Sequence, residues 1–138
     1  MRVVLDVNVL ISALLSRRGS PAQLLIAWQE GEFDLIVSPN LLAELRQALA
    51  YPKLARLVPS ADADRFVAWI SGSAVLAADS AAELPVRPAD PGDDYLIALA
   101  AAERAILVSG DSHITALASD FPIHTPAAFV AILRELRR

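Results

Sequence analysis

The sequence contains no cysteine and only two histidines. The lack of cysteine excludes disulfide bonds, thiolate metal sites and cysteine nucleophiles. We predict that His113 is a surface turn residue and His124 a strand residue, and that neither belongs to a catalytic site. Any metal site in this chain must therefore be built from oxygen ligands.

Lysine is almost absent as well. The 16 acidic residues outnumber the 12 basic residues, which gives a net charge of −4, and Lys53 is the only lysine beside eleven arginines. The negative balance excludes a global basic field that would attract nucleic acid, so a polyanionic partner must be held locally. Arginine side chains suit such local, bidentate contacts with phosphate.

Long apolar runs are missing too. No stretch reaches the roughly 18 uninterrupted apolar residues of a membrane span. The first residues lead into a predicted strand that ends at the charged Asp6, without the basic segment and apolar run of a targeting signal. We therefore expect a cytoplasmic protein. The 138 residues, of which 55% are hydrophobic, suit one well-filled domain over residues 1–138.

Short buried strands alternate with helical patterns along the chain. The predicted strands are 3–5, 33–37, 74–77, 105–108 and one near Ile123. The predicted helices are 8–15, 20–31, 40–51, 62–71, 93–104, 112–118 and 127–136, and a proline-rich loop is expected at 79–91. This alternation predicts an α/β domain with a mainly parallel sheet covered by helices on both faces.

Serine, proline and glycine mark several of the predicted helix boundaries. Ser20-Pro21 and Ser38-Pro39 are typical helix starts, in which serine is the N-cap and proline is the first helical residue. Gly72 is the predicted end of the helix 62–71.

Acidic residues follow the predicted strands at several places. Asp6 comes where the first strand ends, Asp111 follows a later strand, and Glu44 lies in the second turn of a helix that itself follows a strand. Asp93 and Asp94 stand at the start of another helix. Because the carboxyl ends of parallel strands meet at one edge of a sheet, we expect these acids to lie near one another.

Each of these acids also has a simple structural explanation. Asp6, Asp93 or Asp94 can be helix N-caps. Asp111 can be a turn residue, and Glu44 a solvated helix position. The presence of all these acids at one edge is harder to explain by capping and turns alone. Two carboxylates at ~4 Å repel by about 1 kcal/mol in water and about 4 kcal/mol at an effective dielectric constant of about 20. Such a cluster persists around a cation, and oxygen ligands favour Mg²⁺ or Mn²⁺.

Four segments of the chain, 6–11, 38–45, 90–100 and 107–111, resemble the motifs of the PIN domain. More narrowly, they resemble the bacterial PIN proteins related to VapC, the toxin of toxin–antitoxin pairs. The resemblance covers almost the whole chain, with the four motifs in the right order. It implies a three-layer α/β/α sandwich with a mainly parallel central sheet, and metal-dependent cleavage of RNA.

The resemblance also assigns roles to individual residues. The catalytic and metal-binding acids would be Asp6, Glu44, Asp93 and Asp111, with Asn8 and Ser109 as supporting polar groups. The third acid falls on Asp93 in one alignment register and on Asp94 in the other, and on a helix these side chains point about 100° apart. Asp93 is the slightly preferred assignment, and both remain metal-ligand candidates.

The sheet edge at which Asp6, Glu44, Asp93 or Asp94, and Asp111 are predicted to lie is called the acidic edge. Substrate binding would require positive side chains near it. The candidates for RNA binding are Arg17, Arg18, Arg46, Lys53 and Arg56. The resemblance further implies a small antitoxin protein as partner, and it suggests a homodimer.

Other functional classes place acids in similar positions. A phosphoryl-transfer enzyme of the haloacid dehalogenase type has a second aspartate two positions after the first, where this chain has Asn8. A receiver domain has paired acids after the first strand and a late lysine, and both are missing. The stronger alternative is a catalytically silent PIN-like domain that binds RNA or a protein, which loss of one acid would indicate. None of the acids is missing.

Overall fold

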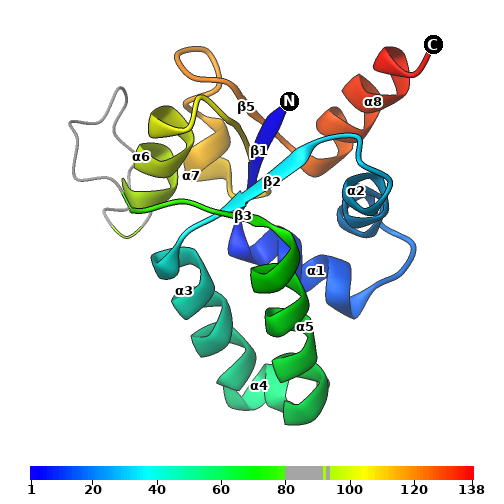
Figure 1. Cartoon of the computed structure of the whole chain (residues 1–138), viewed down its shortest axis with the longest axis vertical. Helices are drawn as coiled ribbons and strands as arrows, with labels where there is room; N and C mark the ends of the chain where they lie inside the picture. Colours follow the sequence, from blue (N-terminus) through cyan, green and yellow to red (C-terminus); the bar gives the residue numbers. More distant parts are fainter. Residues whose placement is uncertain (80–91, 93) are drawn as a thin grey trace.

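A computed structural model describes residues 1–79, 92 and 94–138 (Figure 1). Five strands form one parallel sheet in the order β3-β2-β1-β4-β5. The strands are β1 (Arg2–Leu5), β2 (Asp34–Val37), β3 (Val75–Leu76), β4 (Ile106–Val108) and β5 (Ile123–His124). The predicted parallel α/β sheet is confirmed, and the first strand lies at its centre.

Helices cover both faces of the sheet. They are α1 (Val7–Leu15), α2 (Ser20–Gln29), α3 (Pro39–Ala50), α4 (Pro52–Ala55), α5 (Ser60–Ser73), α6 (Asp94–Ala102), α7 (Ser112–Thr115) and α8 (Pro126–Leu136). Helices α6 and α7 lie on one side of the sheet, and α2 and α8 pack together on the other (Figure 1). This gives the expected α/β/α layers. None of the described helices is both long and apolar enough to cross a membrane.

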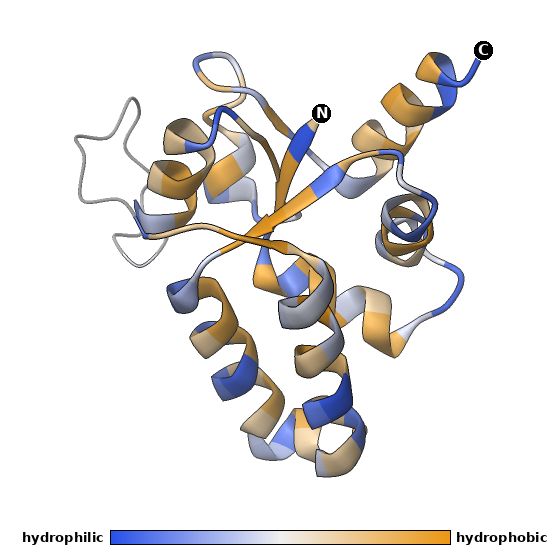
Figure 2. Ribbon diagram, viewed as in Figure 1, coloured by the Kyte–Doolittle hydropathy of each residue, from blue (hydrophilic) through white to orange (hydrophobic). Residues whose placement is uncertain are grey.

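The central strand is apolar on both faces. Val3, Val4 and Leu5 are all fully buried, as expected for a parallel strand with helices above and below it. In Figure 2 the central strands are mostly hydrophobic, whereas the helices carry both hydrophobic and hydrophilic residues. Burial of this strand fixes the residue that follows it, Asp6, at the carboxyl edge of the sheet.

The two Ser-Pro pairs start their helices differently. Ser38 is the N-cap of α3, and its hydroxyl accepts a hydrogen bond from the backbone N–H of Leu41 at 3.2 Å, as predicted. The prediction was wrong by one residue at α2, where Gly19 is the N-cap and Ser20 already lies in the helix. The predicted end of α5 at Gly72 was also too early, since the helix continues to Ser73.

Helices α3, α4 and α5 extend beyond the carboxyl ends of the strands (Figure 1). Helix α3 begins directly after β2, and α5 packs against α3 on its return to β3. Asp79 follows β3, and its carboxylate accepts a hydrogen bond from the backbone N–H of Asn40 at 2.9 Å. Apart from Asp79, the predicted loop 79–91 lies outside the described residues. The start of α3, which carries Glu44, is thus held at the edge where Asp6 lies.

Candidate active site

Asp6 is a buried carboxylate at the end of β1. Only 6% of its surface is exposed. It occupies the N-cap position of α1, and its carboxylate lies close enough to the backbone N–H of Asn8 in this helix for that group to lower its pKa. Its Oδ2 also accepts a hydrogen bond from the Ser109 hydroxyl at 2.7 Å. Helix capping therefore accounts for only part of its contacts, because Ser109 lies 103 residues later, at the end of another strand.

Ser109 connects two of the predicted acids. It lies directly after β4, is fully buried, and donates its hydroxyl proton to Asp6. The same hydroxyl oxygen accepts a hydrogen bond from the backbone N–H of Asp111 at 3.0 Å. Both hydrogen-bonding functions of the hydroxyl are thus used, which fixes the end of β4 against the end of β1.

Asp111 is half-buried and caps the short helix α7. Its Oδ1 accepts a hydrogen bond from the backbone N–H of His113 at 2.8 Å, and Nδ1 of His113 lies 3.4 Å from the same oxygen. Asp111 also lines a cavity of about 300 Å³, together with Asn8 and Ser12. The capping explanation therefore holds for one carboxylate oxygen of Asp111, on the rim of a hollow beside the acidic edge.

Glu44 approaches this edge from α3. Its side chain is exposed, and it accepts a hydrogen bond from the hydroxyl of Tyr95, the second residue of α6. Asp94 is the first residue of α6 and is half-buried. Asp93 lies outside the described residues. Asp6 and Glu44 are 38 residues apart in sequence. In the structure they are close enough for the charge of Glu44 to influence Asp6.

The electrostatic environment of Asp6 disfavours its charged form. Burial raises the pKa of Asp6 above its usual value of 3.8, and the negative charge of Glu44 raises it further. Hydrogen bonds from the Ser109 hydroxyl and from the backbone N–H groups of Asn8 and Val7 lower the pKa, but burial has the larger effect. Within the described part of the chain, neither Asp6 nor Glu44 forms an ion pair with lysine or arginine. A buried carboxylate next to a second carboxylate therefore has no positive partner there.

These features fit a hard divalent cation. The donors at the edge are oxygens, and a cation would remove the repulsion between Asp6 and Glu44. Two acids do not complete a site, however. Over residues 1–79, 92 and 94–138, no three acidic or histidine side chains lie close enough together to hold an ion. Asp6 and Glu44 could thus hold such an ion only with further ligands.

The comparison with known proteins identifies the family. Residues 2–113 match the family model of the PIN domain. This chain belongs to the PIN domain family. No curated protein matches its sequence. A similar solved structure is that of VapBC2 from Rickettsia felis bound to a DNA fragment from their promoter, at 17% identity and a TM-score of 0.68, covering 91% of this chain and 98% of that chain.

At this level of identity the likeness to VapBC2 concerns the fold alone. It agrees with the five-stranded parallel sheet of the present PIN domain. The predicted family and the predicted α/β/α fold are therefore confirmed.

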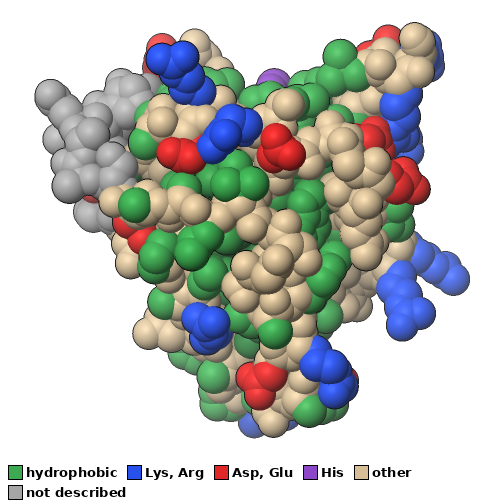
Figure 3. Space-filling view, viewed as in Figure 1, with side chains coloured by type: hydrophobic (Ala, Val, Ile, Leu, Met, Phe, Trp, Pro, Cys, Tyr) green, Lys and Arg blue, Asp and Glu red, His purple; other side chains and the backbone are tan. Residues whose placement is uncertain are grey.

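The basic residues of the PIN domain are not gathered at the acidic edge. Arg17 and Arg18 are exposed on the turn after α1, while Lys53 and Arg56 are exposed at α4, the tip farthest from the sheet (Figure 1). Lys and Arg side chains are spread over several parts of the face seen in Figure 3 and do not form one large patch there. None of these four residues forms an ion pair with another described residue.

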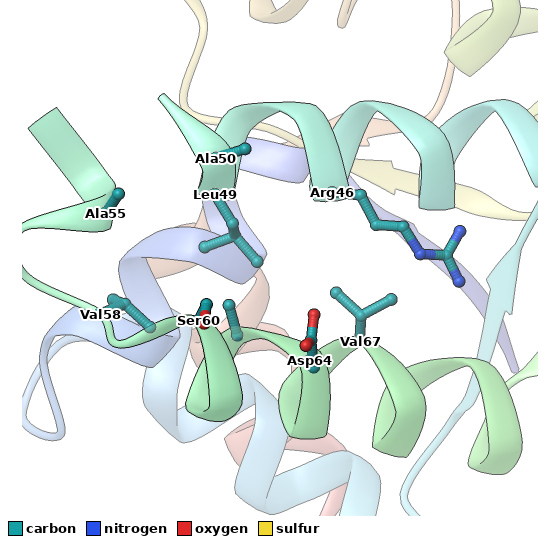
Figure 4. A pocket seen from close by; sticks show the side chains of 9 residues that line it. Arg46, Leu49, Ala50, Ala55, Val58, Ser60, Asp64 and Val67 are labelled. Atoms are coloured by element: carbon teal, nitrogen blue, oxygen red, sulfur yellow. The ribbon is translucent and has the colours of Figure 1, made fainter. Parts of the chain in front are cut away.

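Arg46, the remaining basic candidate, lines a hollow of about 540 Å³ between α3 and α5, opposite Asp64 (Figure 4). The walls of this hollow are mostly apolar and include Leu49, Val58 and Val67. Arg46 lies on α3 two residues beyond Glu44, so it is the basic candidate nearest to the acids along this helix.

Tyr95 is the residue at this site to which sequence reasoning gave no role. It follows the acids of the segment 90–100 directly, but a hydrogen bond to Glu44, which lies 51 residues earlier, leaves no trace in local spacing. The only available signal was the presence of an aromatic hydroxyl beside Asp94.

Proposed function

We propose that this PIN domain is a ribonuclease that uses Mg²⁺ or Mn²⁺ to hydrolyse RNA phosphodiester bonds. One observation supports this proposal above the others. Asp6 is buried, held by Ser109, close enough to Glu44 for its pKa to be raised, and without a positive partner among the described residues. That arrangement costs stability unless a cation binds there.

The residues at the site would have different roles in such a ribonuclease. Asp6 and Glu44 would be the first two ligands of the ion. Asp111 would have to approach them when the ion binds, because no three described acids lie close enough together to hold an ion, and Asp93 or Asp94 would be the fourth acid. A divalent ion bound there supplies an activated water and neutralises charge on the phosphate in the transition state. Ser109 keeps Oδ2 of Asp6 in one position, and Asn8, at the cavity beside Asp111, offers an amide to the substrate.

Four of the basic candidates would bind the RNA backbone away from the scissile bond: Arg17, Arg18, Lys53 and Arg56. Arg46 would bind the backbone closer to the acids. Helix α1 has nine residues and α3 has twelve. At 1.5 Å per residue, the positive residues at their far ends lie roughly 14 to 18 Å from the acidic edge, which corresponds to several nucleotides along a strand. These contacts would position RNA without reading its sequence.

The proposal is tested by incubating the purified protein with RNA in Mg²⁺ or Mn²⁺, with and without EDTA. We expect cleavage that EDTA stops. A small phosphate monoester serves as a second substrate, because its hydrolysis would favour a dehalogenase-type phosphatase instead. RNA that stays intact under all metal conditions while still binding the protein would favour the catalytically silent PIN-like domain.

That silent alternative has one observation in its favour. The described acids do not by themselves form a group of three that could hold an ion. The register of the third acid therefore matters. Comparison of Asp93→Asn with Asp94→Asn in the cleavage assay identifies it, since loss of a ligand should reduce the rate far more than loss of its neighbour on the helix.

We further propose that the nuclease is the toxin of a toxin–antitoxin pair, with a small antitoxin that covers the acidic edge. Two observations support this: the chain belongs to the PIN family, and the similar VapBC2 structure contains a complex of this kind on promoter DNA. Expression in a bacterial host should stop growth, and coexpression of a small protein encoded beside this gene should restore it. Normal growth with the active enzyme present would argue against a toxin.

A homodimer is the proposed oligomeric state. Large apolar side chains are exposed at the end of α1, on α2 and at the end of α8: Leu15, Ile26 and Leu136. Helix α2 packs against both α1 and α8, so these side chains belong to one group of helices. Light scattering at tens of micromolar should give twice the monomer mass, and a monomer at that concentration would refute the dimer.

A further inference from the structure

Tyr95 connects α6 to α3 across the acidic edge. Its hydroxyl donates a hydrogen bond to Oε2 of Glu44. Its ring is half-buried and packs against the hydrophobic core. The hydroxyl is therefore carried by a ring that the core already holds in place.

Glu44 needs such a partner if it is to act as a ligand. It is exposed on the surface of α3, and an unrestrained glutamate samples several side-chain conformations. A carboxylate has about four lone-pair sites, so the hydrogen bond to Oε2 leaves Oε1 open to another partner. Loss of a group that orients a metal ligand in this way typically lowers metal affinity or activity by about 10- to 100-fold.

We infer that Tyr95 is a positioning residue, which holds the carboxylate of Glu44 at the end of β1 so that it presents an oxygen to the divalent ion beside Asp6. This inference rests on the proposed metal-dependent function. It goes beyond that function because Tyr95 is not a ligand and acts only through Glu44.

The natural test is Tyr95→Phe, which removes the hydroxyl and keeps the ring in the core. The chain contains one other tyrosine, Tyr51, which is 66% exposed at the end of α3, so Tyr51→Phe is a matched control. Calorimetric titration with Mn²⁺ should show about tenfold weaker binding for Tyr95→Phe and parental binding for Tyr51→Phe. RNA cleavage by Tyr95→Phe should need a correspondingly higher Mn²⁺ concentration and regain the parental rate at saturation.

A second comparison, made in a protein that carries Glu44→Gln, distinguishes action through Glu44 from a purely structural role of Tyr95. If Tyr95 acts through Glu44, then Tyr95→Phe has no further effect on Mn²⁺ affinity in a protein that already carries Glu44→Gln. Additive losses in the double variant would overturn the inference, and so would parental Mn²⁺ affinity in Tyr95→Phe. A parent protein that neither binds Mn²⁺ nor cleaves RNA would overturn the proposed function itself.

Discussion

The Ser109 hydroxyl donates to Oδ2 of Asp6 at 2.7 Å, and both side chains are buried. Because the same hydroxyl accepts a hydrogen bond from the backbone of Asp111, one small side chain fixes two acids that lie 105 residues apart in sequence. This arrangement orients Asp6 but does not neutralise it.

Asp6→Asn should stabilise the protein in the absence of metal at neutral pH. The raised pKa means that folded protein binds this proton more tightly than the unfolded chain. The free energy of unfolding therefore falls as the pH rises from the usual aspartate pKa of 3.8 through the raised folded value. A gain of about 1 kcal/mol would raise the melting temperature by about 3 °C. Melting curves should converge at acidic pH, and a variant less stable than the parent at neutral pH would contradict this account.

Mg²⁺ or Mn²⁺ should raise the melting temperature of the parent protein. An ion at about 100 times its dissociation constant contributes about 2.7 kcal/mol to the free energy of unfolding. Asp6→Asn should abolish this increase. The control is Asp34→Asn, because Asp34 is an exposed acid at the opposite, amino end of β2. Equal metal-induced shifts in the two variants would exclude Asp6 as a ligand.

Ser109→Ala should destabilise the protein by about 1 to 3 kcal/mol, because the buried carboxylate of Asp6 and the partly buried backbone N–H of Asp111 both lose their hydrogen bond to this hydroxyl. It should also raise the pKa of Asp6 further, since the hydroxyl bond is one of the influences that lower it. The loss of stability is therefore expected to be larger at neutral than at acidic pH. Denaturant unfolding at both pH values measures this, with the exposed Ser73→Ala as control. A loss of stability that does not depend on pH would contradict the claim that Ser109 stabilises the charged form of Asp6.

The fold could be predicted because it depends on local patterns. The buried run Val3 to Leu5, followed by Asp6, specifies a central parallel strand and the place of its acid, and both are observed. Ser38 was predictable as an N-cap because its hydroxyl bonds only three residues away. At Ser20 the same local signal was misleading, since Gly19 already adopts the extended conformation of the cap.

The contacts within the site could not be predicted in the same way. The hydrogen bond from Tyr95 to Glu44 depends on how α6 and α3 meet, and the position of Arg46 opposite Asp64 depends on the packing of α3 against α5. No short-range pattern in the sequence encodes either distance. Sequence therefore predicted that acids lie at one edge of the sheet, and Asp6 and Glu44 are close enough there for the charge of Glu44 to raise the pKa of Asp6. The partners that orient these two acids required the three-dimensional arrangement.

The most direct test of the account is RNA cleavage by variants that remove one charge and preserve volume. Asp6→Asn, Glu44→Gln and Asp111→Asn should each cleave RNA about 100-fold more slowly than the parent in Mn²⁺, with unaltered circular dichroism spectra, because each removes a proposed ligand of the ion. Asp34→Asn should cleave at the parental rate. If all three site variants instead cleave as fast as Asp34→Asn, the activity does not come from this acidic edge, and the proposed ribonuclease function is wrong.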